Sequence, residues 1–160
     1  MSGLQKPAGA RPAFQTSLKG RALRLLGQRE HTRLELERKL ARYEEEPGTL
    51  ARALDELQAK GYLDEQRAAD SLVHRRAGQL GAARLRQEMQ AKGLARELIE
   101  QTLAGLQDGE LARAREVWRR KFDAAPATPQ ERARQARFLL ARGFSGDVVR
   151  RVLGGHPVED

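Results

Sequence analysis

Clusters of arginine and lysine are the residues of this chain whose type and spacing could do chemistry. A guanidinium presents several N–H donors in one plane, so exposed Arg favours a phosphate or an acidic protein surface as a partner. The chain carries 30 Lys+Arg against 22 Asp+Glu, a formal net charge of +8. Our candidates for partner binding are Arg67, Arg75, Arg76, Arg84, Arg86, Arg119, Arg120 and Lys121.

Each of these cations also has a structural interpretation. Most charges alternate in sign along predicted helices, which is typical of solvated helix faces. Arg67 follows Asp64, a predicted helix cap, and could serve a structural ion pair. Arg75 and Arg76 are expected on the outer side of a helix, and Arg84 and Arg86 near one inter-helix edge with their heads in solvent. Sequence alone leaves both interpretations open.

No catalytic or metal-binding constellation accompanies the basic clusters. The Gly-x-x-x-x-Gly-Lys loop that cradles nucleotide phosphates is absent from the sequence. His31 and Glu35 are four residues apart, but two candidate ligands do not make a zinc site. Glu44–Glu46 precede Pro47, where solvated acids near a helix N-terminus are expected. We therefore predict no enzyme activity, no metal, no cofactor and no small-molecule substrate.

Composition narrows the class of protein further. The absence of cysteine excludes disulfides and thiolate metal sites. No apolar run approaches the ~18 residues of a membrane span, and residues 1–16 lack the apolar stretch of a signal peptide. Aromatic residues are few, which argues against a single-strand binder that relies on base stacking. The sequence predicts a cytoplasmic protein with no membrane association.

The elements that must carry these side chains repeat three times. Residues 85–105 align without a gap on residues 135–155, so that Lys92-Gly93-Leu94 falls on Arg142-Gly143-Phe144. A shift of forty-nine residues the other way places the leucines of residues 36–57 under apolar residues of 85–106. Repetition at this period is typical of small supersecondary units that pack on their neighbours and form extended binding surfaces.

We predict an all-α protein of three tandem three-helix modules in an extended array, with about nine helices and no strands. The modules are predicted at residues 19–63, 64–107 and 108–155, flanked by a flexible tail at 1–18 and a short tail at 156–160. Each module is near the lower size limit for a self-sufficient core, so neighbouring modules should support each other. We expect the chain to be a monomer.

Several helix starts and stops can be predicted from local residues. Thr32 with Glu35 forms a capping box, and Thr128–Glu131 combines a cap, Pro at the first helical position and an acid at the third. Pro47 suits the first position of the third helix. Three predicted stops share a base, a left-handed Gly and an apolar residue that folds back on the last turn. They are Lys60-Gly61-Tyr62, Lys92-Gly93-Leu94 and Arg142-Gly143-Phe144.

Three short helices with a Gly-containing turn are also typical of helix-turn-helix DNA readers. Their reading helices expose Arg, Asn, Gln or Ser near the N-terminal end. The third helix of module two instead offers Glu97 and Glu100, which would face phosphate. Sequence-specific DNA reading is therefore disfavoured. Loose phosphate contact by module three stays open, because residues 108–155 hold eleven basic and six acidic side chains.

Four stretches of the chain are specific enough to compare with known families: REHTRLEL at 29–36, GYLDEQR at 61–67, RLRQEMQAKG at 84–93 and RQARFLLARGF at 134–144. The last three resemble the RecX family, bacterial regulators of the RecA recombinase, and the first resembles the family's opening. The resemblance spans roughly residues 19–155. Ala68 departs from the family, which usually has an aromatic residue there. Leu80-Gly81-Ala82 departs from a common Gly-Pro pair, which affects turn stiffness.

The resemblance implies a non-enzymatic modulator that lies along the helical groove of the RecA–DNA filament. It implies suppression of ATP hydrolysis, strand exchange and repressor co-cleavage, and hence a role in recombination, DNA repair and the SOS response. The implied partner is the RecA filament, with single- or double-stranded DNA contacted through the basic surface. A general DNA-binding protein without sequence preference or protein target is the competing hypothesis. Basic charge alone does not separate the two.

Overall fold

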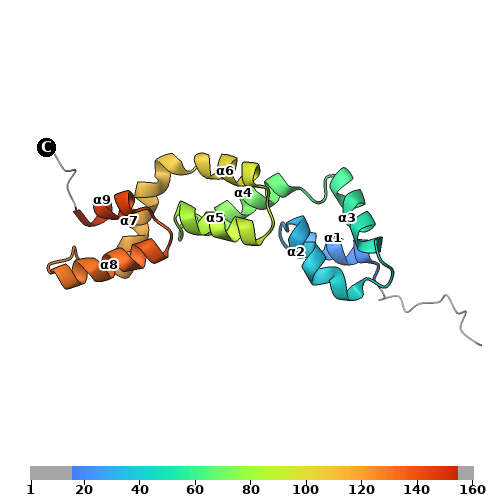
Figure 1. Cartoon of the computed structure of the whole chain (residues 1–160), viewed down its shortest axis with the longest axis horizontal. Coiled ribbons are helices and arrows are strands. Elements are labelled where there is room, and N and C mark those ends of the chain that lie inside the picture. The colour runs from blue at the N-terminus through green and yellow to red at the C-terminus, as the bar shows by residue number, and fades with distance from the viewer. Residues whose placement is uncertain (1–15, 155–160) are drawn as a thin grey trace, which may run out of the picture. The chain divides into compact units, whose positions relative to one another are not determined.

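The computed structural model describes residues 16–154, and every regular element within them is a helix (Figure 1). The all-α prediction is confirmed, with nine α-helices in the described part of the chain. The predicted tails lie outside the described residues, except for residues 16–18. Ser17 caps the first helix, which begins at Leu18, so these two residues belong to that helix and not to a tail.

The chain divides into two compact units, with the break between Asp64 and Glu65. The first unit contains one module. Its helices are α1 (Leu18–Gln28), α2 (Arg33–Leu40) and α3 (Thr49–Ala59), with a short 3-10 turn at Ala41–Tyr43.

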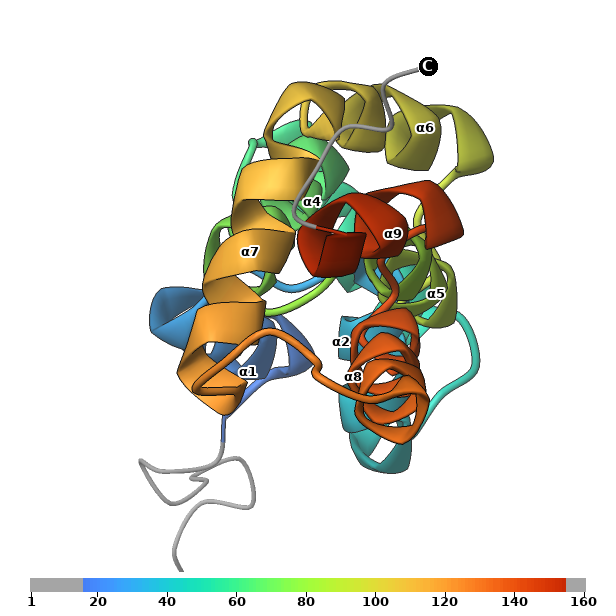
Figure 2. The ribbon, with the colours of Figure 1, turned by 90° about the vertical axis from the view of Figure 1, so that its left-hand side faces the viewer.

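The second unit contains two modules. Helices α4 (Glu65–Arg76), α5 (Ala82–Ala91) and α6 (Arg96–Ala104) form module two, which a 3-10 turn at Gln107–Gly109 connects to module three. Module three consists of α7 (Glu110–Lys121), α8 (Pro129–Ala141) and α9 (Gly146–Gly154), which Figure 2 shows from their own side.

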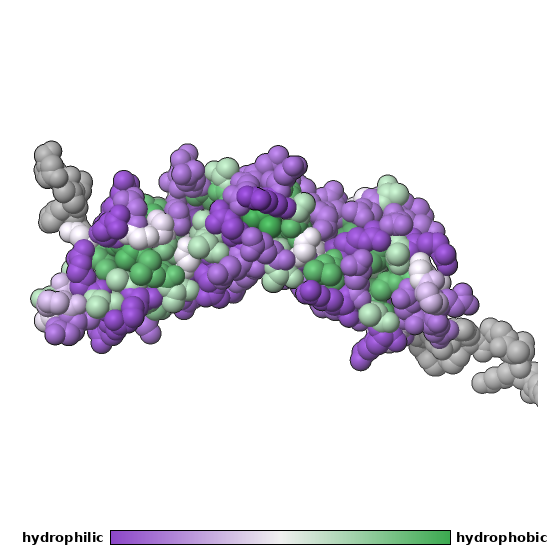
Figure 3. All heavy atoms as spheres, in the orientation of Figure 1, coloured by the Kyte–Doolittle hydropathy of each residue, from purple (hydrophilic) through white to green (hydrophobic). Residues whose placement is uncertain are grey.

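Each module has a hydrophobic core of its own. The fifth residue of the first helix is a fully buried alanine in all three modules: Ala22, Ala69 and Ala114. The third helices each contribute at least two buried aliphatic residues, for example Leu54, Leu103 and Leu153 at equivalent positions. On the face drawn in Figure 3, apolar side chains gather in patches that are framed by hydrophilic ones. The structural repeat therefore follows the repeat in the sequence.

The two helix caps predicted from neighbouring residues, at Thr32 and Thr128, are confirmed. Thr32 and Glu35 exchange both bonds of a capping box, with N···O distances of 3.0 and 3.1 Å. The Thr128 hydroxyl accepts from the Glu131 amide, with Pro129 at the start of α8. The Glu131 carboxylate accepts from the amide of Ala127, one residue before the cap. These bonds satisfy amides that the helix itself leaves unpaired.

All three predicted glycine stops adopt the left-handed conformation, with φ of 82° at Gly61, 79° at Gly93 and 95° at Gly143. The amide after each glycine bonds back to a carbonyl five residues earlier, as in a Schellman motif. The side chains of Leu94 and Phe144 fold back as predicted, whereas Tyr62 is 54% exposed and Leu63 takes the buried place. The expected packing of Tyr62 was wrong because the next residue reaches the core instead.

Pro47 does not begin the third helix, contrary to our prediction. Helix α3 starts two residues later at Thr49, after Gly48 with φ of 90°. The Glu44 carboxylate accepts from the amides of Gly48 and Leu50, so this distant acid supplies the cap. Sequence spacing alone does not reveal a cap that reaches across a turn.

Modules two and three are joined by backbone contacts, which we call the seam. The amide of Gly81 donates to the carbonyl of Arg142 (2.8 Å), and the amide of Ala83 donates to Gly143 (3.2 Å). The first turn of α5 therefore satisfies carbonyls that the end of α8 leaves unpaired, and the two helix ends lie side by side in Figure 1. Arg84 adds a side-chain bond to the carbonyl of Ala141 at 2.8 Å.

The approach at the seam leaves no room for a side chain. A Cβ on Gly81 would lie 2.4 Å from the Gly143 oxygen, and one on Gly143 would lie 2.5 Å from the Arg84 amide nitrogen. Both neighbours are backbone atoms within a helix end and cannot move independently. Glycine is therefore required at both positions for the modules to dock.

His31 is a buried polar side chain just before the start of α2. It is 1% exposed, with Nδ1 2.9 Å from the Arg29 carbonyl oxygen and Nε2 3.0 Å from the Lys39 ammonium. Because Lys39 can only donate, Nε2 accepts and Nδ1–H donates, which fixes the neutral ring. Burial lowers the pKa of His31 below its usual 6.5, opposed by its bond to the Arg29 carbonyl.

We expect Gly81→Ala to destabilise the second unit by about 1–3 kcal/mol, the usual cost of forcing atoms into packed space. Gly78→Ala is the matched control, since a Cβ there meets nothing within 4 Å. Urea unfolding monitored by circular dichroism checks both variants. Equal midpoints for the two would show that the seam tolerates a side chain.

We expect acid to weaken the first unit through His31. The folded-state pKa is lowered, so the unfolded state takes up the proton first and stability falls as the pH drops below 6.5. Denaturant midpoints at pH 7.5 and 5.5 should differ more for the wild-type chain than for His31→Gln. The same decline in both proteins would remove His31 as the cause.

Candidate partner-binding surface

The three predicted arginines of α4 differ in how they are held. Arg76 makes a bidentate pair with Glu88 on α5, at 3.2 and 3.0 Å, and this hydrogen-bonded carboxylate raises the pKa of Arg76. Arg75 is exposed and has no partner among the described residues. Arg67 is exposed on the first turn and is held by an interaction within the chain. Arg75 is thus the guanidinium of this helix with the most freedom to meet a partner.

Arg84 and Arg86 do not share one solvent edge as expected. Arg84 reaches across the seam to the Ala141 carbonyl. Arg86 pairs with Glu100 on α6 through two bonds of 2.8 and 3.2 Å, which raise the pKa of Arg86 and lower that of Glu100. Both side chains are half-buried and engaged in tertiary contacts, which the spacing around the inward-facing Leu85 did not reveal.

The basic end of α7 is the predicted cluster that lines a hollow. A cleft of about 200 Å³, which we call the seam cleft, is lined by Gln79, Val117, Arg120, Lys121, Phe138 and Arg142. The Arg142 guanidinium lies 5.0 Å from the Phe138 ring centroid, and the Lys121 ammonium lies 5.6 Å from it. Arg120 donates to the Gly78 carbonyl at 3.4 Å and also lies 3.8 Å from the Glu116 carboxylate, which accepts from Arg119 at 3.2 Å. Gln79, the lining residue from module two, also accepts from Arg76 at 3.4 Å.

Three cations and no acid line the seam cleft, which favours a phosphate or a carboxylate over a neutral ligand. Lys121 and Arg142 also stand at the C-terminal ends of helices, where a cation stabilises the helix dipole whether or not a ligand binds. Sequence reasoning assigned Arg142 only to a helix stop. The cleft forms because α7 packs beside α8 and the seam adds Gln79 of module two, and neither tertiary contact leaves a local signal in the sequence.

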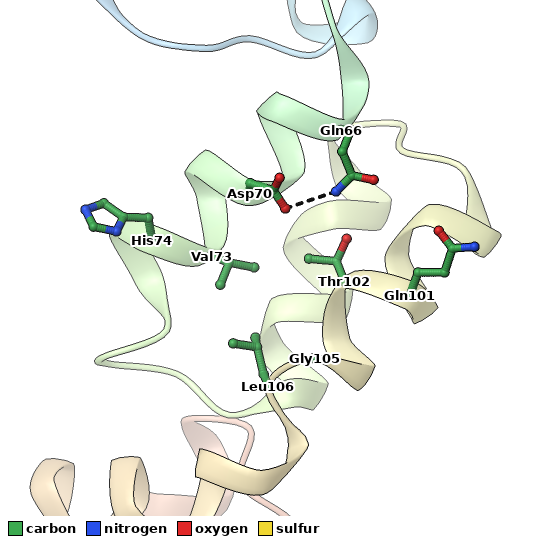
Figure 4. Close-up of a pocket in the computed structure, with 8 residues that line it drawn as sticks. All are labelled: Gln66, Asp70, Val73, His74, Gln101, Thr102, Gly105 and Leu106. Atoms are coloured by element: carbon green, nitrogen blue, oxygen red, sulfur yellow. Dashed lines mark hydrogen bonds between the residues drawn. The ribbon is translucent and has the colours of Figure 1, made fainter.

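A second hollow lies between α4 and α6 of module two, and we call it the α4–α6 groove (Figure 4). It is an open groove of about 590 Å³, and the sequence did not predict it. Val73, Thr102 and Leu106 point into it, and Gln66 donates to Asp70 across one turn of α4 at 3.0 Å. No lysine or arginine lines this groove, so its chemistry is opposite to that of the seam cleft.

Within residues 16–154, no three potential ligand side chains gather in a way that could hold a metal ion. His31 directs both ring nitrogens to Arg29 and Lys39, which leaves neither for a metal. No helix in that range has both the length and the apolar character that crossing a bilayer requires.

Comparison with family models matches each module separately. Residues 19–57 match the first three-helix domain of RecX, residues 64–103 match the second, and residues 108–153 match the third. The three matches follow the order of the modules along the chain.

Individual relatives extend the match over most of the chain. "Regulatory protein RecX" of Leptothrix cholodnii is 53% identical over 139 residues, 87% of this chain and 88% of that protein. The protein of the same name from Ralstonia nicotianae is 46% identical over 146 residues, 91% and 92% of the two chains.

Two solved structures share the fold at 19% sequence identity. "Crystal structure of regulatory protein RecX" aligns with a TM-score of 0.72 over 87% of this chain and 72% of that one. RecX from Lactobacillus salivarius aligns with a TM-score of 0.70 over 86% and 93%. The relatives are named as regulators, so this chain is a regulatory protein and not an enzyme. Since its three modules match in order and its relatives align along nearly their whole lengths, the chain belongs to the RecX family.

Proposed function

We propose that this chain binds the RecA filament assembled on DNA, lies along its helical groove and inhibits ATP hydrolysis, strand exchange and co-cleavage of the repressor. The observation that carries this proposal is the match of all three modules to the three RecX domains. The chain would thereby limit recombination, DNA repair and the SOS response. We further propose that it acts in the cytoplasm as a monomer.

The repeated architecture supports binding to a repeating partner. Several weak contacts on one partner raise the overall affinity, because each bound module increases the effective concentration of the next. The seam holds modules two and three together, so two binding surfaces reach the partner at a fixed spacing with little further ordering cost. A filament offers such repeated surfaces, whereas a small ligand does not.

General DNA binding is the second candidate function, and the seam cleft is the observation that favours it. Arg120, Lys121 and Arg142 present their charges on one cleft with no acidic residue in its lining. A phosphodiester backbone could be held there without sequence preference. In the first proposal, the same cleft would hold DNA or acidic residues within the filament.

We expect the folded chain to slow ATP hydrolysis by RecA on single-stranded DNA at a few-fold molar excess, and to hydrolyse no ATP itself. A coupled ATPase assay measures both. Excess free DNA, added after filament assembly, separates the two candidates: inhibition that persists supports the recombinase as target, and inhibition that disappears supports general DNA binding. Unchanged RecA turnover would contradict the first proposal.

We expect the double variant Lys121→Gln with Arg142→Gln to bind single-stranded DNA more weakly. The slope of log affinity against log salt should become shallower by about 1, as for the loss of one or two phosphate contacts. Arg134→Gln with Arg137→Gln is the matched control, because both side chains are exposed on α8 and have no partner among the described residues. Anisotropy titrations at several salt concentrations would contradict the role of the cleft if the two variants behaved alike.

A further inference from the structure

Two residues beside the α4–α6 groove, Val73 and Gly105, are smaller than their equivalents in module one, Leu26 and Glu56. The first helices α1, α4 and α7 align from their first residues, with the buried alanine fifth in each. At the ninth position stand Leu26, Val73 and Trp118. Leu26 and Trp118 pack against the cores of their modules. Module two thus has the smallest side chain of the three at this position.

The second position of the same helices shows a similar difference. Lys19 of α1 forms an ion pair with Glu56 of α3, which crosses the first module between its first and third helices. The buried Leu54 and Leu103 are equivalent, so Glu56 corresponds to Gly105, and Lys19 corresponds to Gln66. In module three, the second position is Leu111. The ion pair that spans module one therefore has no counterpart in module two.

Nothing in the backbone requires a glycine at position 105. Gly105 has φ of −68° and ψ of −13°, which any residue adopts. A Cβ there would meet only the Thr102 carbonyl oxygen at 3.5 Å, an ordinary contact. The glycine at the mouth of the groove thus keeps space open, although neither strain nor crowding demands it.

The lining of the groove favours a protein side chain over a phosphate. Its floor is formed by Val73 and Leu106, which are only partly buried against the core of module two. Asp70 stands at the rim with the amides of Gln66 and Gln101. In the described part of the chain, no cation pairs with Asp70, although the protein is strongly basic. An apolar side chain next to a lysine or arginine would complement this surface, whereas a phosphate would be repelled.

We propose that the α4–α6 groove is a docking site for a segment of the RecA protomer that presents an apolar side chain beside a lysine or arginine. The inference rests on the proposed function, since it names the surface through which the recombinase is held. Val73, Thr102 and Leu106 receive the apolar side chain, and Asp70 pairs with the neighbouring cation. The seam cleft remains available to DNA at the same time.

The test transfers the ion pair of module one into module two. Gln66→Lys with Gly105→Glu should close the groove without changing the net charge, and we expect filament affinity to fall at least tenfold. Gly27→Glu with Gln28→Lys is the matched control: it uses the same residue types at exposed positions near the end of α1, and its affinity should stay within twofold of wild type. Anisotropy with preassembled RecA filaments measures both, and binding to free single-stranded DNA should not change. Equal filament affinity of two folded variants would overturn the proposal.

A second experiment detects the contact directly and does not depend on a loss of binding. The chain contains no cysteine, so Gly105→Cys gives a unique attachment point for a photoreactive benzophenone. Crosslinking to RecA within the filament is expected; crosslinking to DNA, to a second copy of the chain or to nothing would contradict the assignment. If wild type inhibits RecA but position 105 does not crosslink to it, the groove proposal fails alone. If wild type does not bind the filament, the proposed function fails with it.

Discussion

The seam between α5 and α8 is the contact on which the functional surface depends. Its two backbone hydrogen bonds pair the amides of one helix start with the carbonyls of another helix end, and they need Gly81 and Gly143 to approach without side chains. Because the bonds involve backbone atoms, they fix the relative direction of the two helices. The seam places Arg120 and Lys121 of α7 next to Gln79 and beside Arg142. Without it, the three cations of module three would lose the wall of the cleft that Gln79 of module two supplies.

The seam also explains how far the sequence could predict the structure. Helix starts and stops depend on a few neighbouring residues, so the capping box at Thr32 and the left-handed glycine stops were predicted correctly. Pro47 and Tyr62 were misjudged, because Glu44 caps from outside the local pattern and Leu63 takes the buried place. The seam cleft and the α4–α6 groove arise from tertiary contacts and from missing side chains. The seam cleft leaves no local pattern in the sequence. The α4–α6 groove appears only when equivalent positions of the modules are compared in space.

The two hollows of the second unit have complementary chemistry. The seam cleft is basic and suits phosphate, whereas the α4–α6 groove has an apolar floor and the Asp70 carboxylate, which accepts from Gln66 but pairs with no cation of the described residues, and suits a protein segment. A nucleoprotein filament presents both kinds of surface to one ligand. We infer that the second unit is adapted to such a composite partner, with its rigidity supplied by the seam. The charge pairs of Arg76 and Arg86 then serve mainly to hold module two together.

Hydrogen exchange of the chain with and without its partner tests this account most directly. The account predicts that the RecA filament slows amide exchange in α4 and α6 around the groove and at the end of α7. Free single-stranded DNA should protect only the residues near the seam cleft, and the amides of Gly81 and Ala83 should exchange slowly in every state, because they are bonded across the seam. Fast exchange at Gly81 and Ala83 in the free chain, or filament protection confined to the first unit, would contradict it.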